Sequence, residues 1–232
     1  MDTTKTGKVI ITEGIIGVGK TTFSEILSKH LNAEWMKEPD EECGNPYLSL
    51  FYSDPKRYAI IMQLHLLNIR YRMHLNAQWS SMQSGKNIVL DRSYFGDTAF
   101  ANLQLENGTI TQNEYDTYCM SYQNMTSNVL LPQVCVYLDV DPEVSQERVK
   151  KRMEIQIGRV CENAIDIQYL INLKKHQDRV INTLESQGVK IIKINWNKSR
   201  SLEDITNVAK SVATTILNME EKTFMDLHRR TM

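Results

Sequence analysis

The sequence predicts an α/β fold, a three-layer α/β/α sandwich built on a five-stranded parallel sheet. Short apolar runs rich in β-branched residues, the pattern of strands buried on both faces, alternate along the chain with segments of helical spacing. The first of these runs leads directly into a glycine-rich stretch and then a helix. Strands that alternate with helices form parallel sheets covered on both faces, so we expect one domain spanning residues 1–232.

Five apolar runs are the predicted strands. They cover residues 8–13, 33–37, 87–90, 134–138 and 189–194. Pro39 ends the second strand because proline cannot donate to a sheet ladder. Glu38 therefore stands at the carboxyl end of a strand, where open α/β sheets bind their ligands.

Apolar residues recur at helical spacing between the strands. The longest such segment covers residues 56–83, contains no glycine or proline, and is introduced by a polar and aromatic stretch ending in Pro55. The other helices are expected after Lys20, on both sides of residues 107–109, from 141, from near 165 and from near 201.

Composition excludes several classes of protein. The 232 residues, 41% of them hydrophobic, can build one well-buried domain. The formal net charge of -1, with basic residues spread along the chain, predicts no nucleic-acid or membrane surface. No apolar run approaches the roughly 18 residues of a membrane span, and the first residues lack an apolar signal core. The four cysteines lie far apart, which indicates reduced thiols in a cytoplasmic protein.

The stretch from Gly14 to Thr21 fits the phosphate-loop pattern of Gly, four residues, Gly, Lys and a hydroxyl residue. The glycines let backbone N–H groups point inward, and the following helix adds its positive end. Lys20 would reach the β- and γ-phosphates, and the Thr21 hydroxyl would hold Mg²⁺. We therefore expect ATP or another nucleoside triphosphate, bound by Gly14, Ile15, Ile16, Gly17, Val18, Gly19, Lys20, Thr21 and Thr22.

Phosphoryl transfer also needs a group that takes the acceptor's proton and cations that neutralise charge. Glu38 is the candidate base, and Asp91, at the end of the third strand, is a candidate Mg²⁺ ligand. Arg92 could contact the acceptor oxygen and the phosphate. Taken alone, Glu38 could be an ordinary loop glutamate, and Asp91 with Arg92 a structural ion pair. A segment that could close over the triphosphate as a lid, about residues 152–164, carries Arg152 and Arg159.

Further motifs extend from about residue 8 to 195. Beyond the phosphate loop and Glu38, they comprise residues 45–48, 51–58, Gln63, residues 91–97, 158–159, Glu162 and residues 169–170. The Tyr-x-Asp-Pro-x-Arg-aromatic segment followed by a helical glutamine is far more specific than a phosphate loop. On these residues the chain resembles the deoxynucleoside kinases of the deoxycytidine, deoxyguanosine and mitochondrial thymidine kinase type, which implies a P-loop kinase.

The resemblance implies a role for each matching residue. Glu38 matches the general base that takes the proton from a nucleoside 5′-hydroxyl as it attacks the γ-phosphate, with Lys20 on that phosphate. Arg92 matches the arginine that steadies this base and the developing charge. Gln63 matches the amide that pairs with the nucleobase. Tyr52 and Glu162 match the pair that binds the 3′-hydroxyl. The implied product is a deoxynucleoside 5′-monophosphate in nucleotide salvage.

Arg70 and Asp97 bear on the choice of base. They stand where the deoxycytidine and deoxyguanosine kinases carry an Arg and an Asp facing the base, whereas thymidine-preferring relatives have apolar residues. A charged pair can hydrogen-bond an amino group or ring nitrogen but crowds the thymine methyl group. This favours deoxycytidine and purine deoxynucleosides. The alternative is a salt bridge between helix and loop that does not touch substrate.

The chain also departs from the family pattern. Residues 40–43 are acidic where relatives have Val-x-x-Trp, and Met153 and Ile157 replace lid arginines. Asp91 replaces a glutamate, and Asn195 replaces an aspartate of the adenine-contacting loop. The family's homodimers imply a dimer here, with a face on the long helix and residues 111–129, around Tyr115, Tyr118, Tyr122 and Met125. Burial of these residues within one subunit is the alternative.

Two other functions share some of these motifs. A thymidylate kinase has the phosphate loop, the Glu-Pro and an Asp-Arg pair, but needs arginines for the acceptor's phosphate, and the stretch after Pro39 is acidic. A GTPase switch needs an Asn-Lys-x-Asp motif, and residues 197–200 lack the aspartate. A deoxynucleoside kinase is the favoured interpretation.

Overall fold

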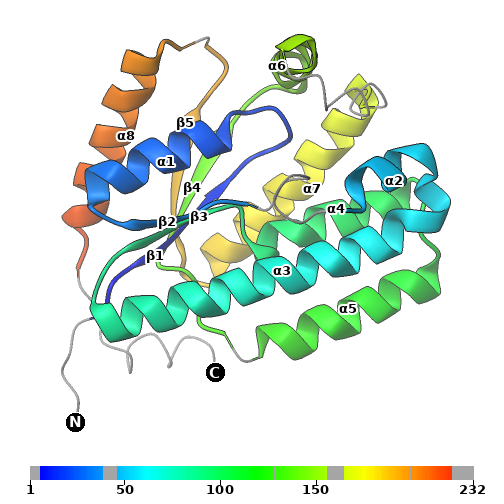
Figure 1. The fold of residues 1–232 in the computed structure, drawn as a ribbon, viewed down its shortest axis with the longest axis horizontal. Coiled ribbons are helices and arrows are strands. Elements are labelled where there is room, and N and C mark those ends of the chain that lie inside the picture. The colour runs from blue at the N-terminus through cyan, green and yellow to red at the C-terminus, as the bar shows by residue number, and fades with distance from the viewer. Residues whose placement is uncertain (1–5, 39–45, 128, 156–164, 199, 221–232) are drawn as a thin grey trace.

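The computed structural model describes residues 6–38, 46–127, 129–155, 165–198 and 200–220. At its centre is a five-stranded sheet in which all neighbours are parallel, in the order β2-β3-β1-β4-β5 (Figure 1). The predicted fold class is confirmed, and the strand boundaries differ from the prediction by at most one residue. The strands are β1 (Val9–Glu13), β2 (Glu34–Met36), β3 (Ile88–Asp91), β4 (Val134–Asp139) and β5 (Lys190–Asn195).

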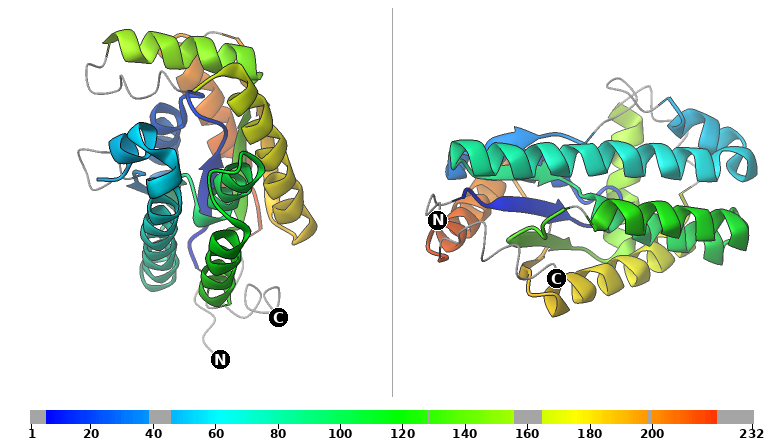
Figure 2. Two further views of the ribbon diagram at one scale, coloured as in Figure 1. Left: turned by 90° about the vertical axis from the view of Figure 1, so that its right-hand side faces the viewer. Right: turned by 90° about the horizontal axis from the view of Figure 1, so that it is seen from below.

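Helices cover both faces of the sheet (Figures 1 and 2). Those that the structure describes are α1 (Lys20–Leu31), α2 (Leu48–Ser53), α3 (Pro55–Ser84), α4 (Tyr94–Glu106), α5 (Gln112–Thr126), α6 (Pro142–Ile155), α7 (Ile167–Ser186) and α8 (Leu202–Leu217). The short helix α2 was not predicted as a separate element. It is divided from α3 at Asp54, which has φ −146° and ψ 80°, because a residue before proline is driven out of the helical region.

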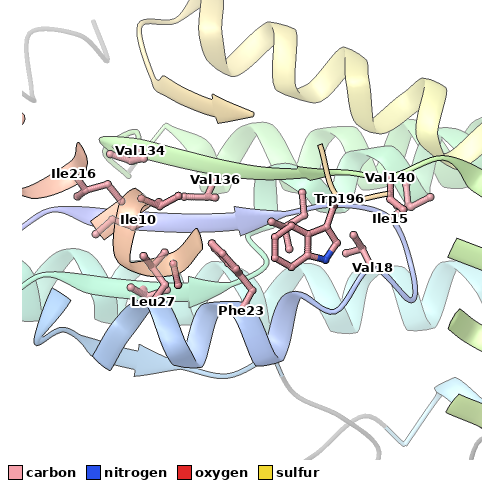
Figure 3. Close-up of a cluster of buried hydrophobic side chains, with 14 of the residues drawn as sticks. Ile10, Ile15, Val18, Phe23, Leu27, Val134, Val136, Val140, Trp196 and Ile216 are labelled. Carbon is pink, nitrogen blue, oxygen red and sulfur yellow. The ribbon is translucent and has the colours of Figure 1, made fainter. Parts of the chain in front are cut away.

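Successive side chains of β1 pack in opposite layers of the sandwich. Ile10 packs in a cluster with Phe23 and Leu27 of α1 and Ile216 of α8 (Figure 3). Ile11 joins a second cluster with residues of α3, α4, α5 and α7. This burial on both faces explains why the strand is apolar throughout rather than alternating.

The strand register brings three chain segments to one edge of the sheet. In the parallel pairing of β1 with β3, Thr12 lies opposite Asp91, and in that of β2 with β3, Met36 lies opposite Leu90. The segments that follow these strands therefore leave the sheet side by side. They carry the phosphate loop, Arg92 and Glu38.

Helix α6 packs against the phosphate loop and donates hydrogen bonds to its backbone. The Ser145 hydroxyl donates a hydrogen bond to the Ile16 carbonyl, and the Arg148 guanidinium donates to the Val18 carbonyl at 3.3 Å. Arg148 also donates to the Trp196 carbonyl after β5, at 2.8 Å. One helix thus links the loop after β1 to the loop after β5.

The tyrosines proposed for a dimer face do not all lie on the surface. Tyr118 is 1% exposed, and its hydroxyl donates to Asp97 inside the subunit. The within-subunit alternative therefore holds for Tyr118, while the homodimer remains a prediction. Among the described helices, none is both long enough and apolar enough to cross a bilayer. The cytoplasmic location remains a prediction.

The close packing of α6 on the loop predicts the cost of a side chain at Gly17. Gly17 has φ 77° and Gly19 has φ 94°, so alanine is strained at both positions. A Cβ at Gly17 would lie 2.6 Å from Cγ2 of Val149, whereas one at Gly19 meets nothing within 4 Å. We expect Gly17→Ala to lower the free energy of unfolding by roughly 1–3 kcal/mol more than Gly19→Ala, as overpacking does. Urea unfolding without ligands measures the difference, and equal losses would contradict it.

Candidate active site

The phosphate loop connects β1 to the first turn of α1. Gly19 caps the helix in a left-handed conformation, and Lys20 is its first residue. The Lys20 ammonium group is buried and donates to the carbonyls of Gly14 and Ile15, both at 3.1 Å. Burial, followed by the positive charge of Arg92, lowers the pKa of Lys20 to about 7. The Lys20 side chain therefore lies against the same backbone that would surround a bound phosphate.

Thr21 and Asp91 form a pair of oxygen donors beside this loop. The Thr21 hydroxyl donates to Asp91 Oδ2 at 2.6 Å. Asp91 is 2% exposed, and no described residue donates a hydrogen bond to its other oxygen, Oδ1. Burial and the negative charge of Glu38 raise the pKa of Asp91. A buried carboxylate oxygen without a partner, next to a hydroxyl group, matches the ligand chemistry of Mg²⁺, so these two predicted ligands fit the ion.

Glu38 follows β2 and lies between two arginines. Nε of Arg92 donates to its carboxylate at 3.2 Å, and the Arg70 guanidinium of α3 forms an ion pair with it. The Glu38 side chain is 24% exposed, so it is reachable from solvent. Burial alone would raise the pKa of Glu38, but the charges of Arg92 and Arg70 outweigh it and lower the pKa to about 2. Two arginines therefore hold the Glu38 carboxylate in one position.

Arg92 occupies a turn with unusual backbone geometry. Its φ is 69°, in the left-handed region that non-glycine residues seldom adopt. The backbone N–H of Arg92 donates to the Thr12 carbonyl at 3.0 Å, and Ser93 then caps α4. The guanidinium lies 4.9 Å from the centre of the Phe100 ring, which supports it from one side. Strain of this kind is typical of functional turns.

Arg70 also forms an ion pair with Asp97, in the first turn of α4. Asp97 is fully buried and accepts further hydrogen bonds from the Gln63 amide at 2.7 Å and the Tyr118 hydroxyl at 2.8 Å. Burial raises the pKa of Asp97, and the charge of Arg70 opposes the rise. Among described residues, nothing donates to Gln63 Oε1, so this buried oxygen remains as an acceptor. The predicted base-reading residues therefore form one cluster.

The remaining predicted residues fall in three places. Tyr52 lies on α2, where its ring packs against Phe51 and against the apolar cluster of Val149, Ile165 and Leu170. Arg152 lies on α6. Arg159 and Glu162, with most of the expected lid, lie outside the described residues, as do residues 40–43.

Sequence reasoning missed three residues of this site. Phe100 supports both Arg92 and Arg70, and Tyr118 contacts Asp97. Glu13 is a fully buried carboxylate at the end of β1, 3.7 Å from the Arg92 guanidinium. A signal for Glu13 was present, because a charged residue in an otherwise apolar strand needs a buried partner. No local pattern distinguishes Phe100 or Tyr118 from core residues.

The chain is similar to several known proteins. A family model described as deoxynucleoside kinase matches residues 10–218. Deoxyguanosine kinase of Dictyostelium discoideum is 36% identical over 200 residues, covering 86% of this chain and 68% of the relative. Deoxyadenosine kinase of the same organism is 34% identical over 205 residues, covering 88% and 79%. The structure of deoxyadenosine kinase from M. mycoides with bound dATP matches 91% of this chain and 100% of that chain, with a TM-score of 0.73 and 26% identity.

The residues that the family model matches, 10–218, include the phosphate loop, Glu38 and Asp97. These matches favour the nucleoside kinase over the thymidylate kinase considered from the sequence. The chain belongs to the deoxynucleoside kinase family, whose members use a nucleoside triphosphate as donor.

Proposed function

We propose that this kinase transfers the γ-phosphate of ATP, or of another nucleoside triphosphate, to the 5′-hydroxyl of a purine deoxynucleoside or deoxycytidine. The observation that carries the proposal is the position of Glu38. Its carboxylate is held by two arginines, and one of them, Arg92, directly follows Asp91, which accepts a hydrogen bond from Thr21 at the end of the phosphate loop. A carboxylate that can activate an alcohol is thus part of the same site as the phosphate loop.

The low pKa of Glu38 specifies how it would act. At neutral pH the carboxylate is ionised and accepts a hydrogen bond from the 5′-hydroxyl, which orients that oxygen. A group with a pKa of about 2 is a weak base, so it takes the proton only as the new oxygen–phosphorus bond forms and the hydroxyl becomes acidic. Phosphoryl transfer through a loose transition state suits this late proton transfer. Arg92 and Lys20 would neutralise charge on the transferring group.

Thr21 and Asp91 would hold Mg²⁺ beside the phosphate loop. The ion would supply charge neutralisation at the β- and γ-phosphates. Asp91 would contribute the oxygen that lacks a partner among the described residues.

The cluster around Asp97 supports the proposed choice of base. Asp97 engages the amide nitrogen of Gln63, so Gln63 Oε1 is left to accept a hydrogen bond, such as one from an exocyclic amino group. The two curated relatives described above act on deoxyguanosine and deoxyadenosine. Tyr52 is the proposed contact of the deoxyribose, as the resemblance implies.

The substrate proposal predicts a ranking of nucleosides. With ATP and Mg²⁺, we expect deoxyadenosine, deoxyguanosine or deoxycytidine to give larger kcat/KM values than thymidine, measured by formation of the 5′-monophosphate.

Replacing Arg70 with Met and Asp97 with Ala removes the charged pair, so the ranking should move towards thymidine. Total turnover should fall as well, because Arg70 also pairs with Glu38. An unchanged ranking in the double variant would show that the pair does not read the base.

The role of Glu38 predicts a selective loss of turnover. Glu38→Gln removes the carboxylate at nearly constant size, so kcat should fall by about 10²–10⁴-fold, the range for a lost general base. The dissociation constant for ATP should change little, since the phosphate loop is intact. Glu34→Gln is the matched control, because Glu34 is exposed at the start of β2, the strand that Glu38 follows. Retained turnover in Glu38→Gln would remove Glu38 from the reaction.

The environment of Lys20 predicts proton uptake when nucleotide binds. With a pKa of about 7, Lys20 is largely neutral at about pH 8.5, whereas the phosphates of bound nucleotide favour the charged form. Binding should therefore take up as much as about one proton at this pH, where the terminal phosphate of ATP is already ionised. Titration calorimetry in two buffers of different ionisation enthalpy measures the uptake. Lys20→Arg should show none, because a guanidinium stays charged. Equal heats for the unchanged protein in both buffers would contradict the prediction.

A further inference from the structure

Glu13 is a fully buried carboxylate to which the proposed transfer assigns no part. It is the last residue of β1, immediately before the phosphate loop. Three donors converge on its two oxygens: the Ser93 N–H at 3.0 Å, the Ser93 hydroxyl at 2.6 Å and the Gln177 amide at 3.3 Å. An ionised carboxylate only accepts hydrogen bonds, so it is the form that satisfies all of these donors. Burial raises the pKa of Glu13, and the charge of Arg92 opposes that rise.

These contacts fasten the turn that carries Arg92. A left-handed backbone is unfavourable for a non-glycine residue such as Arg92, so the turn needs contacts that hold it. At Arg92 itself, the backbone N–H donates a hydrogen bond to the Thr12 carbonyl at 3.0 Å. At the next residue, the N–H and the hydroxyl of Ser93 both donate hydrogen bonds to Glu13. Nη1 of Arg92 lies 3.7 Å from Glu13, while Nε of the same guanidinium reaches Glu38.

Two other helices close around the Glu13 carboxylate. A Cβ added at Gly96, in the first turn of α4, would lie 2.5 Å from both carboxylate oxygens. Any side chain there would have to displace a group that is held by three hydrogen bonds. On the other side, α7 supplies Gln177, which is also fully buried. The site is therefore shaped for a carboxylate in one position.

We propose that Glu13 is a positioning residue that holds the Arg92 turn so that the guanidinium is aimed at Glu38 during phosphoryl transfer. Glu13 touches no reacting atom in this proposal and acts only through Arg92. The inference rests on the proposed roles of Arg92 and Glu38. The alternative is a buried charge that contributes only to folding.

Glu13→Gln separates these two roles. The amide oxygen of the introduced side chain can still accept from Ser93, and its NH₂ group then faces Gln177. Gln177 can turn its amide and accept, because its Oε1 has no hydrogen-bond partner among the described residues. The variant can thus satisfy its neighbours and fold, while the attraction to Arg92 is lost and an amide N–H faces the guanidinium.

The test measures kcat, KM for both substrates and the melting temperature of Glu13→Gln. If Glu13 positions Arg92, kcat falls by up to roughly 10²-fold, as misplacement of a reacting group by an ångström does, while KM changes little. In a double-mutant cycle, Glu13→Gln should cost little further once Arg92→Met has removed the guanidinium. Gln78→Met is the control for stability, because it removes a buried hydrogen bond to the Leu130 N–H far from this turn. It should lower the melting temperature and leave kcat unchanged.

The outcomes distinguish the inference from the proposed function. Should Arg92→Met lower kcat while Glu13→Gln lowers only the melting temperature, Glu13 is structural and the inference is wrong. Additive losses in the cycle would also overturn it, because Glu13 would then act independently of Arg92. Should Arg92→Met leave kcat unchanged, the proposed role of Arg92 fails, and the inference fails with it.

Discussion

The parallel pairing of β1 with β3 is the constraint on which the site depends. It sets Thr12 opposite Asp91, so the phosphate loop and the Arg92 turn leave the sheet at the same edge. β2 then pairs with the outer side of β3 and brings Glu38 to that edge. Residues that are distant in sequence meet because three strands point the same way and end at the same level.

Charges of alternating sign, all buried except the partly exposed Glu38, extend across this edge of the sheet. They run from Glu13 through Arg92, Glu38 and Arg70 to Asp97, and each one is within an ion-pair distance of the next. Removing charges from water costs free energy that their attraction only partly returns, so such a series contributes little to stability. What it does provide is fixed geometry, because each charge limits the position of its two neighbours. The aromatic ring of Phe100 supports both arginines and adds to this rigidity.

The sequence predicted the parts of this arrangement that have a local pattern. The strands, the long helix and the phosphate loop are each recognisable from periodicity or spacing, and the position of Glu38 followed from Pro39. The contacts of Glu13 could not be predicted in this way, since its partners Ser93 and Gln177 lie 80 and 164 residues away. Tyr118 illustrates the same limit. Its helical spacing suited a dimer face as well as the interior, and only the folded chain brings its hydroxyl to Asp97.

The position of Arg70 between Glu38 and Asp97 has a consequence for divergence within the family. Its side chain pairs both with Asp97, in the cluster proposed to select the nucleobase, and with Glu38, which is proposed to activate the alcohol. A lineage that exchanged this arginine to accept a new nucleobase would at the same time remove one of the two arginines that hold Glu38. Changes of specificity at this position should therefore be epistatic, viable only where another residue has already taken over the restraint on Glu38.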